Sequence, residues 1–145
     1  MQEIVDFANN NLLLVTGLIA SGLAAVFYEL RLKARNVASL GIPMAVRMIN
    51  DGSKIVDVRP AEKYAAGHIV DARNIPADEL LGSPDKLKAG KKNTLLVCDN
   101  GARSGEVTAK LRKDGNESVF SIRGGLAAWQ QDNLPVVRDD DGSAT

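Results

Sequence analysis

The 145-residue sequence contains a single cysteine, Cys98, and a single histidine, His68. A lone cysteine excludes an intramolecular disulfide, so the fold must be held together by its core. Basic residues are absent from the first thirty positions, and all 18 lie at Arg31 or beyond. Without that opening segment the chain has 18 basic and 15 acidic residues. Because nucleic-acid binding needs a clustered basic face, we expect no nucleic-acid partner.

The opening segment also holds a long charge-free run, the seventeen residues of Leu12–Tyr28. At 1.5 Å per residue a helix of this run is about 26 Å long, and its apolar flanks bring it near the roughly 30 Å of a hydrocarbon core. The sequence therefore predicts a short N-terminal segment, residues 1–11, and a transmembrane helix over residues 12–30. A cleavable signal peptide is the main alternative, although the acidic start does not suit one, and a buried core helix is the other.

Charge predicts the orientation of this helix. Arg31, Lys33 and Arg35 form a basic juxtamembrane linker over residues 31–35. The positive-inside rule then places the C-terminal domain in the cytoplasm and the N-terminus outside. Small residues recur every four positions along the helix, at Gly17, Ser21 and Ala25. Such a stripe permits self-association or packing against a membrane-protein partner, and the competing interpretation is that small residues are common in membrane spans.

Residues 36–138 alternate short apolar segments with amphipathic ones. The expected strands are residues 36–40 (or an extended lead-in), Lys54–Val58, Thr94–Val97 and, as the last strand, Ser118–Ile122. The expected helices begin at Pro43, at Pro60, at Arg103 and at Gly125, with short helical turns at 78–81 and 84–87. This order predicts an α/β domain with a mainly parallel central sheet flanked by helices. The acidic tail, residues 139–145, is expected to be disordered.

The predicted strand Thr94–Val97 delivers Cys98 to the carboxyl edge of the sheet, where ligands bind in open α/β folds. The loop amides and the start of the next helix would converge on the sulfur, favouring the thiolate and stabilising a terminal anionic sulfur. Gly101 allows unusual backbone angles, Arg103 adds a charge at the rim, and Ser104 can cap the helix or donate to the sulfur. The alternative is a buried cysteine that only fills space.

Four residues separate Cys98 from Arg103. Loops of Cys-dependent phosphatases and arsenate reductases, which enclose a tetrahedral oxyanion, have five residues between the two. The shorter loop suits a single sulfur atom, and Asp99 beside the nucleophile would repel a dianion. The spacing therefore predicts a persulfide carrier in preference to a phosphatase.

Residues from about Val37 to Val137 resemble a single rhodanese-like domain. The resemblance rests on motifs in the right order: Asp57-Val58-Arg59, Glu62 and Tyr64, Gly67-His68-Ile69, Ala72-Arg73-Asn74-Ile75-Pro76, the Cys98 loop, Gly124-Gly125-Leu126, Trp129 and Leu134-Pro135-Val136. Together with the N-terminal span, they make the chain similar to the membrane-anchored, single-domain bacterial members. That similarity implies a location at a bacterial inner membrane.

The resemblance implies a sulfurtransferase in which Cys98 takes sulfur from a donor such as thiosulfate or a small persulfide and passes it to a thiol or another nucleophilic acceptor. It implies that Cys98 and Arg103 are catalytic and that the substrate-binding loop comprises Asp99, Asn100, Gly101, Ala102 and Ser104. The backbone N–H groups of residues 100–104 would form the cradle for the sulfur.

The same resemblance implies structural support from Asp57, Arg59 and His68, and it implies no metal or organic cofactor. Asp99 occupies a position where a basic residue would assist an anionic donor, so we expect thiosulfate to be a poor substrate. The alternative function is a membrane-anchored interaction module on the same fold, with weak or incidental catalysis.

Overall fold

The computed structural model describes residues 1–87 and 92–139, and for residues 33–37 it describes the backbone alone. The chain divides into two compact units, Met1–Ala34 and Arg35–Thr145. Most of the tail that was expected to be disordered, residues 140–145, lies outside the described residues.

Two helices form the N-terminal part, α1 (Gln2–Asn10) and α2 (Leu12–Val37). Within α2, Leu12–Leu32 is a 21-residue stretch of mean hydropathy 1.8 that is not buried, and it is long and apolar enough to cross a membrane. The helix continues unbroken through residues 31–37, because no glycine or proline interrupts it before Gly41. The expected juxtamembrane linker is therefore helical, and the prediction of extended chain at residues 36–37 is wrong.

The second unit is built on a five-stranded parallel sheet. Its strand order is β1 (Ser39–Leu40), β6 (Val119–Ile122), β5 (Thr94–Val97), β2 (Lys54–Asp57) and β4 (Arg73–Asn74). The prediction of a mainly parallel sheet flanked by helices is confirmed. A separate antiparallel pair joins β3 (His68–Ile69) to β7 (Val136–Val137). Since β7 follows the last helix, the prediction that residues 118–122 form the last strand is wrong; two residues are too few to show a strand period.

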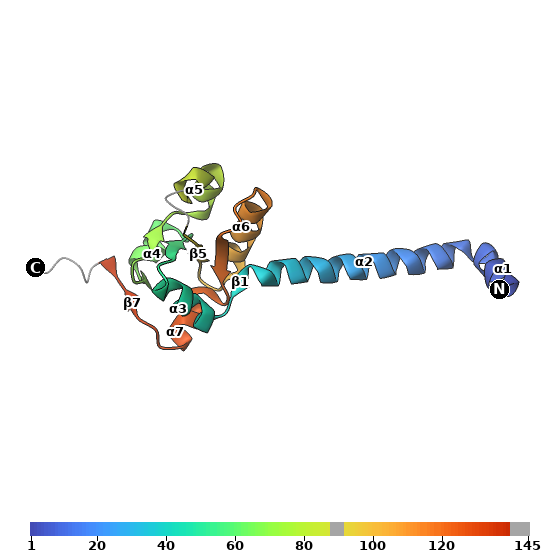
Figure 1. Cartoon of the computed structure of the whole chain (residues 1–145), viewed down its shortest axis with the longest axis horizontal. Helices are drawn as coiled ribbons and strands as arrows, with labels where there is room; N and C mark the ends of the chain where they lie inside the picture. The colour runs from blue at the N-terminus through green and yellow to red at the C-terminus, as the bar shows by residue number, and fades with distance from the viewer. Residues whose placement is uncertain (88–91, 140–145) are drawn as a thin grey trace, which may run out of the picture. The chain divides into compact units, whose positions relative to one another are not determined.

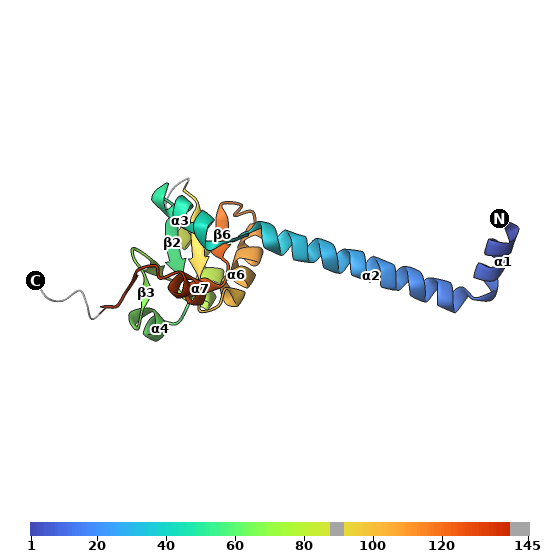
Figure 2. The ribbon, with the colours of Figure 1, turned by 90° about the horizontal axis from the view of Figure 1, so that it is seen from below.

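Helices cover both faces of the sheet. On one side lie α3 (Ile42–Asn50) and α7 (Gly125–Gln131), and on the other α5 (Ala77–Gly82) and α6 (Ala102–Lys113) (Figure 1; Figure 2). The short helices α4 (Ala61–Ala65) and η1 (Pro84–Leu87) lie in the connections.

Side chains of β5 alternate between two hydrophobic cores. Val97 packs in the cluster that contains Trp129 of α7, whereas Leu96 packs in the cluster that contains Leu111 of α6. Cys98 is the next residue after Val97, and by the same alternation it joins the α6 cluster. The period of the strand therefore places the sulfur at the start of α6, at the carboxyl end of the central strand.

Candidate active site

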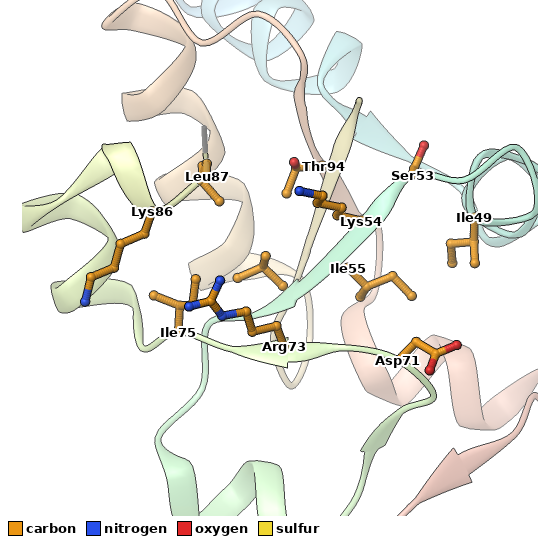
Figure 3. A pocket seen from close by; sticks show the side chains of 11 residues that line it. Ile49, Ser53, Lys54, Ile55, Asp71, Arg73, Ile75, Lys86, Leu87 and Thr94 are labelled. Atoms are coloured by element: carbon orange, nitrogen blue, oxygen red, sulfur yellow. The ribbon is translucent and has the colours of Figure 1, made fainter. Parts of the chain in front are cut away.

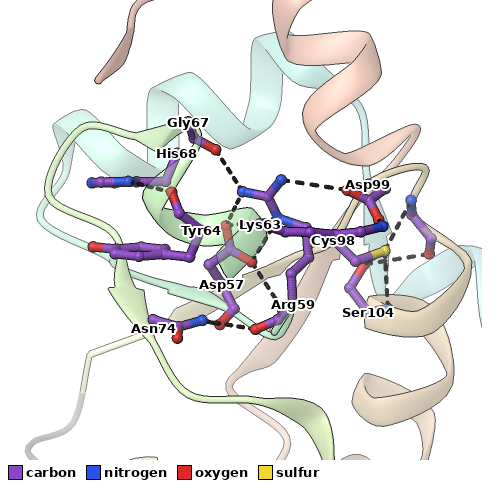
Figure 4. Close-up of polar contacts among 11 residues, drawn as sticks. Asp57, Arg59, Lys63, Tyr64, Gly67, His68, Asn74, Cys98, Asp99 and Ser104 are labelled. Atoms are coloured by element: carbon purple, nitrogen blue, oxygen red, sulfur yellow. Dashed lines mark hydrogen bonds and ion pairs between the residues drawn. The ribbon is translucent and has the colours of Figure 1, made fainter. Parts of the chain in front are cut away.

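Cys98 lies directly after β5 with only 3% of its surface exposed. The backbone N–H of Gly101 donates to Cys98 Sγ at 3.1 Å, and the N–H of Ser104 donates at 3.3 Å (Figure 4). The thiol itself donates to the buried Ser104 Oγ at 3.3 Å. In the thiolate form the Ser104 hydroxyl can turn to donate to the sulfur. Three polar groups at the first turn of α6 therefore surround one sulfur atom.

Fewer amides contact the sulfur than the expected set from residues 100–104. The N–H of Ala102 donates to the side-chain oxygen of Asn100 at 3.0 Å and is thus directed away from the sulfur. The residue that caps α6 is Gly101, in the left-handed conformation with φ +85°, and Ser104 sits within the helix. Of the two roles considered for Ser104, the structure shows contact with the sulfur.

The carbonyl oxygens of the loop are held on the opposite side by the start of α7. Leu126 N–H donates to the Cys98 carbonyl at 2.8 Å, and Ala127 N–H donates to the Asp99 carbonyl at 3.0 Å. These amides belong to the first turn of a helix and would otherwise have no partner within it. The start of α7 thus holds the carbonyl side of the loop, while the amides of Gly101 and Ser104 face Sγ.

Two glycines allow this close approach. At Gly101 a Cβ would lie 2.8 Å from the Gly124 nitrogen, and at Gly125, with φ +58°, a Cβ would lie 2.3 Å from the Cys98 carbonyl oxygen. Neither distance is compatible with a side chain. The role of α7 was missed from the sequence, although a glycine pair directly before a helix is a signal of close backbone contact.

A buried ion pair lies behind the loop. Arg59 donates through Nε and Nη2 to the carboxylate of Asp57 at 2.7–3.1 Å, and Nη2 also donates to the Gly67 carbonyl at 2.7 Å. Burial acts to lower the pKa of Arg59, but the hydrogen bonds and charges of Asp57 and, to a smaller extent, Asp99 together outweigh it and raise that pKa. Asn74 donates to the carbonyls of Asp57 and Arg59 at 3.1 and 2.8 Å. These contacts join the end of β2 to its neighbouring loops.

Asp99 is tied to two cations. Lys63 Nζ donates to one carboxylate oxygen of Asp99 at 2.7 Å, and Arg59 Nη1 donates to the other at 3.3 Å (Figure 4). The Lys63 hydrogen bond, supported by Arg59 against a smaller opposing effect of burial, holds the pKa of Asp99 below its ordinary value. The charge beside the nucleophile is thus shared with two cations. Sequence reasoning could not find this contact because Lys63 lies 36 positions away.

His68 lies against Tyr64. The two rings stack with centroids 3.7 Å apart and planes 11° from parallel, and His68 Nδ1 is 2.9 Å from the Tyr64 carbonyl oxygen. The Tyr64 hydroxyl donates to the Ala72 carbonyl at 2.5 Å. Tyr64 thus links α4 to the segment between β3 and β4. His68 packs against the ring of Tyr64 and contacts the backbone of the same residue.

A pocket of about 350 Å³ opens in front of Cys98. Its walls include apolar side chains, and Lys63, Asp78, Asp99 and Arg103 lie around it. Arg103 Nη2 donates to Asp78 Oδ1 at 3.0 Å. A larger pocket of about 420 Å³ lies elsewhere, at the amino ends of β2 and β5 beside Lys54 and Thr94 (Figure 3). Of these two pockets only the smaller contains the cysteine. We therefore take the smaller pocket as the candidate active site.

Comparison with known proteins identifies the family of this chain. The family model for the rhodanese-like domain matches residues 44–132. An uncharacterized Synechocystis protein is 38% identical over 89 residues, 61% of this chain and 49% of that protein. The chain thus spans about half the length of that relative. The uncharacterized protein YibN of Escherichia coli is 29% identical over 141 residues, 95% of this chain and 99% of YibN.

Two further relatives carry descriptive names. The chloroplastic thiosulfate sulfurtransferase 16 of Arabidopsis thaliana is 30% identical over 115 residues, 72% of this chain and 96% of that protein. A rhodanese-related protein of Thermoplasma volcanium has a crystal structure that superposes with a TM-score of 0.62 at 26% identity, covering 68% of this chain and 96% of that one. The family match covers more than half of the chain and includes the Cys98 loop, so the chain belongs to the family of rhodanese-like domain proteins.

Proposed function

We propose that this protein is a sulfurtransferase that carries sulfane sulfur as a persulfide on Cys98. The observation that carries the proposal is the set of Gly101 N–H, Ser104 N–H and Ser104 Oγ, all within 3.3 Å of Cys98 Sγ at the base of a pocket. Hydrogen-bond donors of this kind stabilise negative charge on sulfur, first on the Cys98 thiolate and then on the outer sulfur of the persulfide. Similarity to a thiosulfate sulfurtransferase of Arabidopsis thaliana supports the proposal.

The transfer needs no external electrons. The Cys98 thiolate attacks the outer sulfur of a donor, a new S–S bond forms at Sγ, and the donor's own S–S bond breaks, its electron pair leaving with the remainder of the donor. A thiolate acceptor then attacks the outer sulfur of the Cys98 persulfide and restores the Cys98 thiolate. Arg103, at the rim of the pocket, is proposed to stabilise the negative charge of donor and leaving group.

Intact-mass analysis of the full-length protein tests this function. Exposure to thiosulfate or glutathione persulfide should add about 32 Da, the mass of one sulfur atom on a thiolate nucleophile. Cys98→Ala should keep the fold and gain no mass. Absence of any gain in the folded wild type with every donor would contradict the function. In that case the alternative, an interaction module, would require Cys98→Ala to leave cellular function intact.

We also propose that residues 12–30 anchor the protein in a membrane with the domain in the cytoplasm. Support comes from the length and hydropathy of the stretch that contains them and from the position of Arg31 directly after residue 30. A reporter fused after Thr145 that is active only outside the cytoplasm should stay inactive, whereas the same reporter before Met1 should be active. The reverse pattern would overturn the orientation. Recovery of the intact chain in the soluble fraction would overturn the anchor.

A further inference from the structure

Two exposed ion pairs lie at the rim of the Cys98 pocket. Arg103 of α6 pairs with Asp78 of α5 at 3.0 Å, and their side chains are 57% and 89% exposed. Lys63 of α4 pairs with Asp99 of the loop at 2.7 Å, and their side chains are 58% and 52% exposed. The rim thus presents two cations and two carboxylates to an incoming molecule. Because exposed ion pairs contribute little to stability, they can exchange partners with a ligand at little cost.

Part of the wall of the same pocket is apolar. The lining includes Val58, Pro60, Pro76 and Ala77 beside the charged and polar side chains, and the two prolines are the more exposed of the four. The volume of about 350 Å³ gives room for a carbon skeleton in contact with these side chains. An inorganic donor such as thiosulfate has no carbon atoms to bury against them. Contact with an apolar wall therefore favours an organic donor.

We propose, building on the function above, that this pocket selects a zwitterionic organic persulfide, the persulfide of an amino acid or short peptide. The donor's carboxylate would pair with Arg103, which can bind it through two parallel hydrogen bonds, and its ammonium would pair with Asp78. Thiosulfate is a dianion, so it would gain the cations but face both carboxylates. Asp78 is then a residue that determines donor specificity.

The transfer step balances with this donor. The Cys98 thiolate attacks the terminal sulfur of R–S–SH, the Sγ–S bond forms, and the S–S bond of the donor breaks. The bonding pair leaves with R–S⁻, and the transferred sulfur keeps its proton. No oxidant or reductant takes part, since the sulfane sulfur only exchanges one sulfur neighbour for another.

The test compares three donors on the full-length protein: cysteine persulfide, the uncharged hydroxyethyl persulfide, and thiosulfate. The readout is the second-order rate constant for mass gain on Cys98. Asp78→Asn should lower the rate with cysteine persulfide about fivefold and raise the rate with thiosulfate by a similar factor, since about 1 kcal/mol acts between unit charges 4 Å apart in water. The rate with hydroxyethyl persulfide should change less than about twofold, because an uncharged donor lacks this Coulomb energy.

Asp114→Asn is the matched control, because Asp114 is an exposed carboxylate at the far end of α6. It should leave all three rates unchanged. A uniform change with every donor in Asp78→Asn, or no opposite change between cysteine persulfide and thiosulfate, would overturn the inference alone. Failure of every donor to load wild-type Cys98 would overturn the sulfurtransferase function and this inference with it.

Discussion

Lys63 and Asp99 meet across 36 residues of sequence, with the ammonium 2.7 Å from the carboxylate. The contact ties α4 to the loop that carries Cys98 and offsets a negative charge next to the nucleophile. The charges of Lys63 and Asp99 therefore offset each other, and a substitution of one leaves the charge of the other without this partner.

Asp99→Asn should raise the rate of sulfur transfer from thiosulfate. The substitution removes a carboxylate and releases Lys63 to face the dianion, and we expect a gain of roughly fivefold, from about 1 kcal/mol between unit charges 4 Å apart in water. Mass gain on Cys98 in the full-length protein measures it, with Asp114→Asn as the control. A fall in the rate would show instead that Asp99 chiefly holds the loop in place.

The same pair makes stability depend on pH. The folded state holds the pKa of Asp99 below its ordinary value, so the unfolded chain binds this proton more readily. The stabilisation is present above the unfolded pKa and is lost as pH falls through the folded one. Asp99→Asn should therefore flatten the acid side of the stability profile, by no more than about 1 kcal/mol since the pair is exposed. Urea unfolding at pH 3 to 6 measures this, and an unchanged acid slope would contradict it.

Gly125→Ala should abolish sulfur loading and destabilise the domain. A Cβ there would overlap the Cys98 carbonyl at 2.3 Å and require a left-handed backbone, so we expect a cost of about 2–4 kcal/mol. Gly105→Ala is the control, because a Cβ at Gly105 meets its nearest neighbour at 4.0 Å inside α6. Fluorescence of Trp129, the sole tryptophan and 5% exposed, reports unfolding in both variants. Equal behaviour of the two variants would refute the close-contact argument.

Arg59→Met and Arg103→Met should differ sharply in stability. The first leaves the fully buried Asp57 carboxylate without its guanidinium, at a cost of about 3–5 kcal/mol. The second breaks an exposed pair and should change the free energy of unfolding by less than about 1 kcal/mol. Urea unfolding followed by Trp129 fluorescence compares them. Similar losses in both would contradict the ranking by burial.

Ser104→Ala should slow formation of the Cys98 persulfide about tenfold. The variant removes the hydroxyl that lies 3.3 Å from Sγ, and a hydrogen bond to a charged group contributes about 1.5–3 kcal/mol. Ser121→Ala is the matched control: its hydroxyl is equally buried and donates to the Ala38 carbonyl at 3.4 Å. Stopped-flow loading with a persulfide donor separates the two. Equal loading rates in the two variants would show that the Ser104 hydroxyl does not stabilise the sulfur.

Local patterns predicted the part of the site that is continuous in sequence. A threonine and three apolar residues, Thr94–Val97, mark a buried strand, and Gly101 marks the turn into α6, so the position of Cys98 followed from the chain itself. The sheet and its flanking helices followed from the same alternation of segments.

Contacts between distant segments were not predictable in this way. The amides of α7 that hold the loop and the Lys63–Asp99 pair depend on how elements pack, and no spacing rule connects them. Strand β7 has only two residues, and α2 continues to Val37 because nothing in that sequence stops a helix. The Gly124-Gly125 pair signals a close backbone contact but not its partner, and the other features depend on tertiary structure or on the absence of a helix breaker.

The hydrogen bonds from α7 to the Cys98 loop can form only after both segments have been synthesised. Synthesis proceeds from the N-terminus, so the cysteine emerges well before Leu126 and Ala127, whose amides shape its surroundings. A chain cut short before Gly124 keeps the thiol but lacks the groups that hold its loop. The complete set of contacts around the Cys98 loop therefore forms only after α7 has been synthesised.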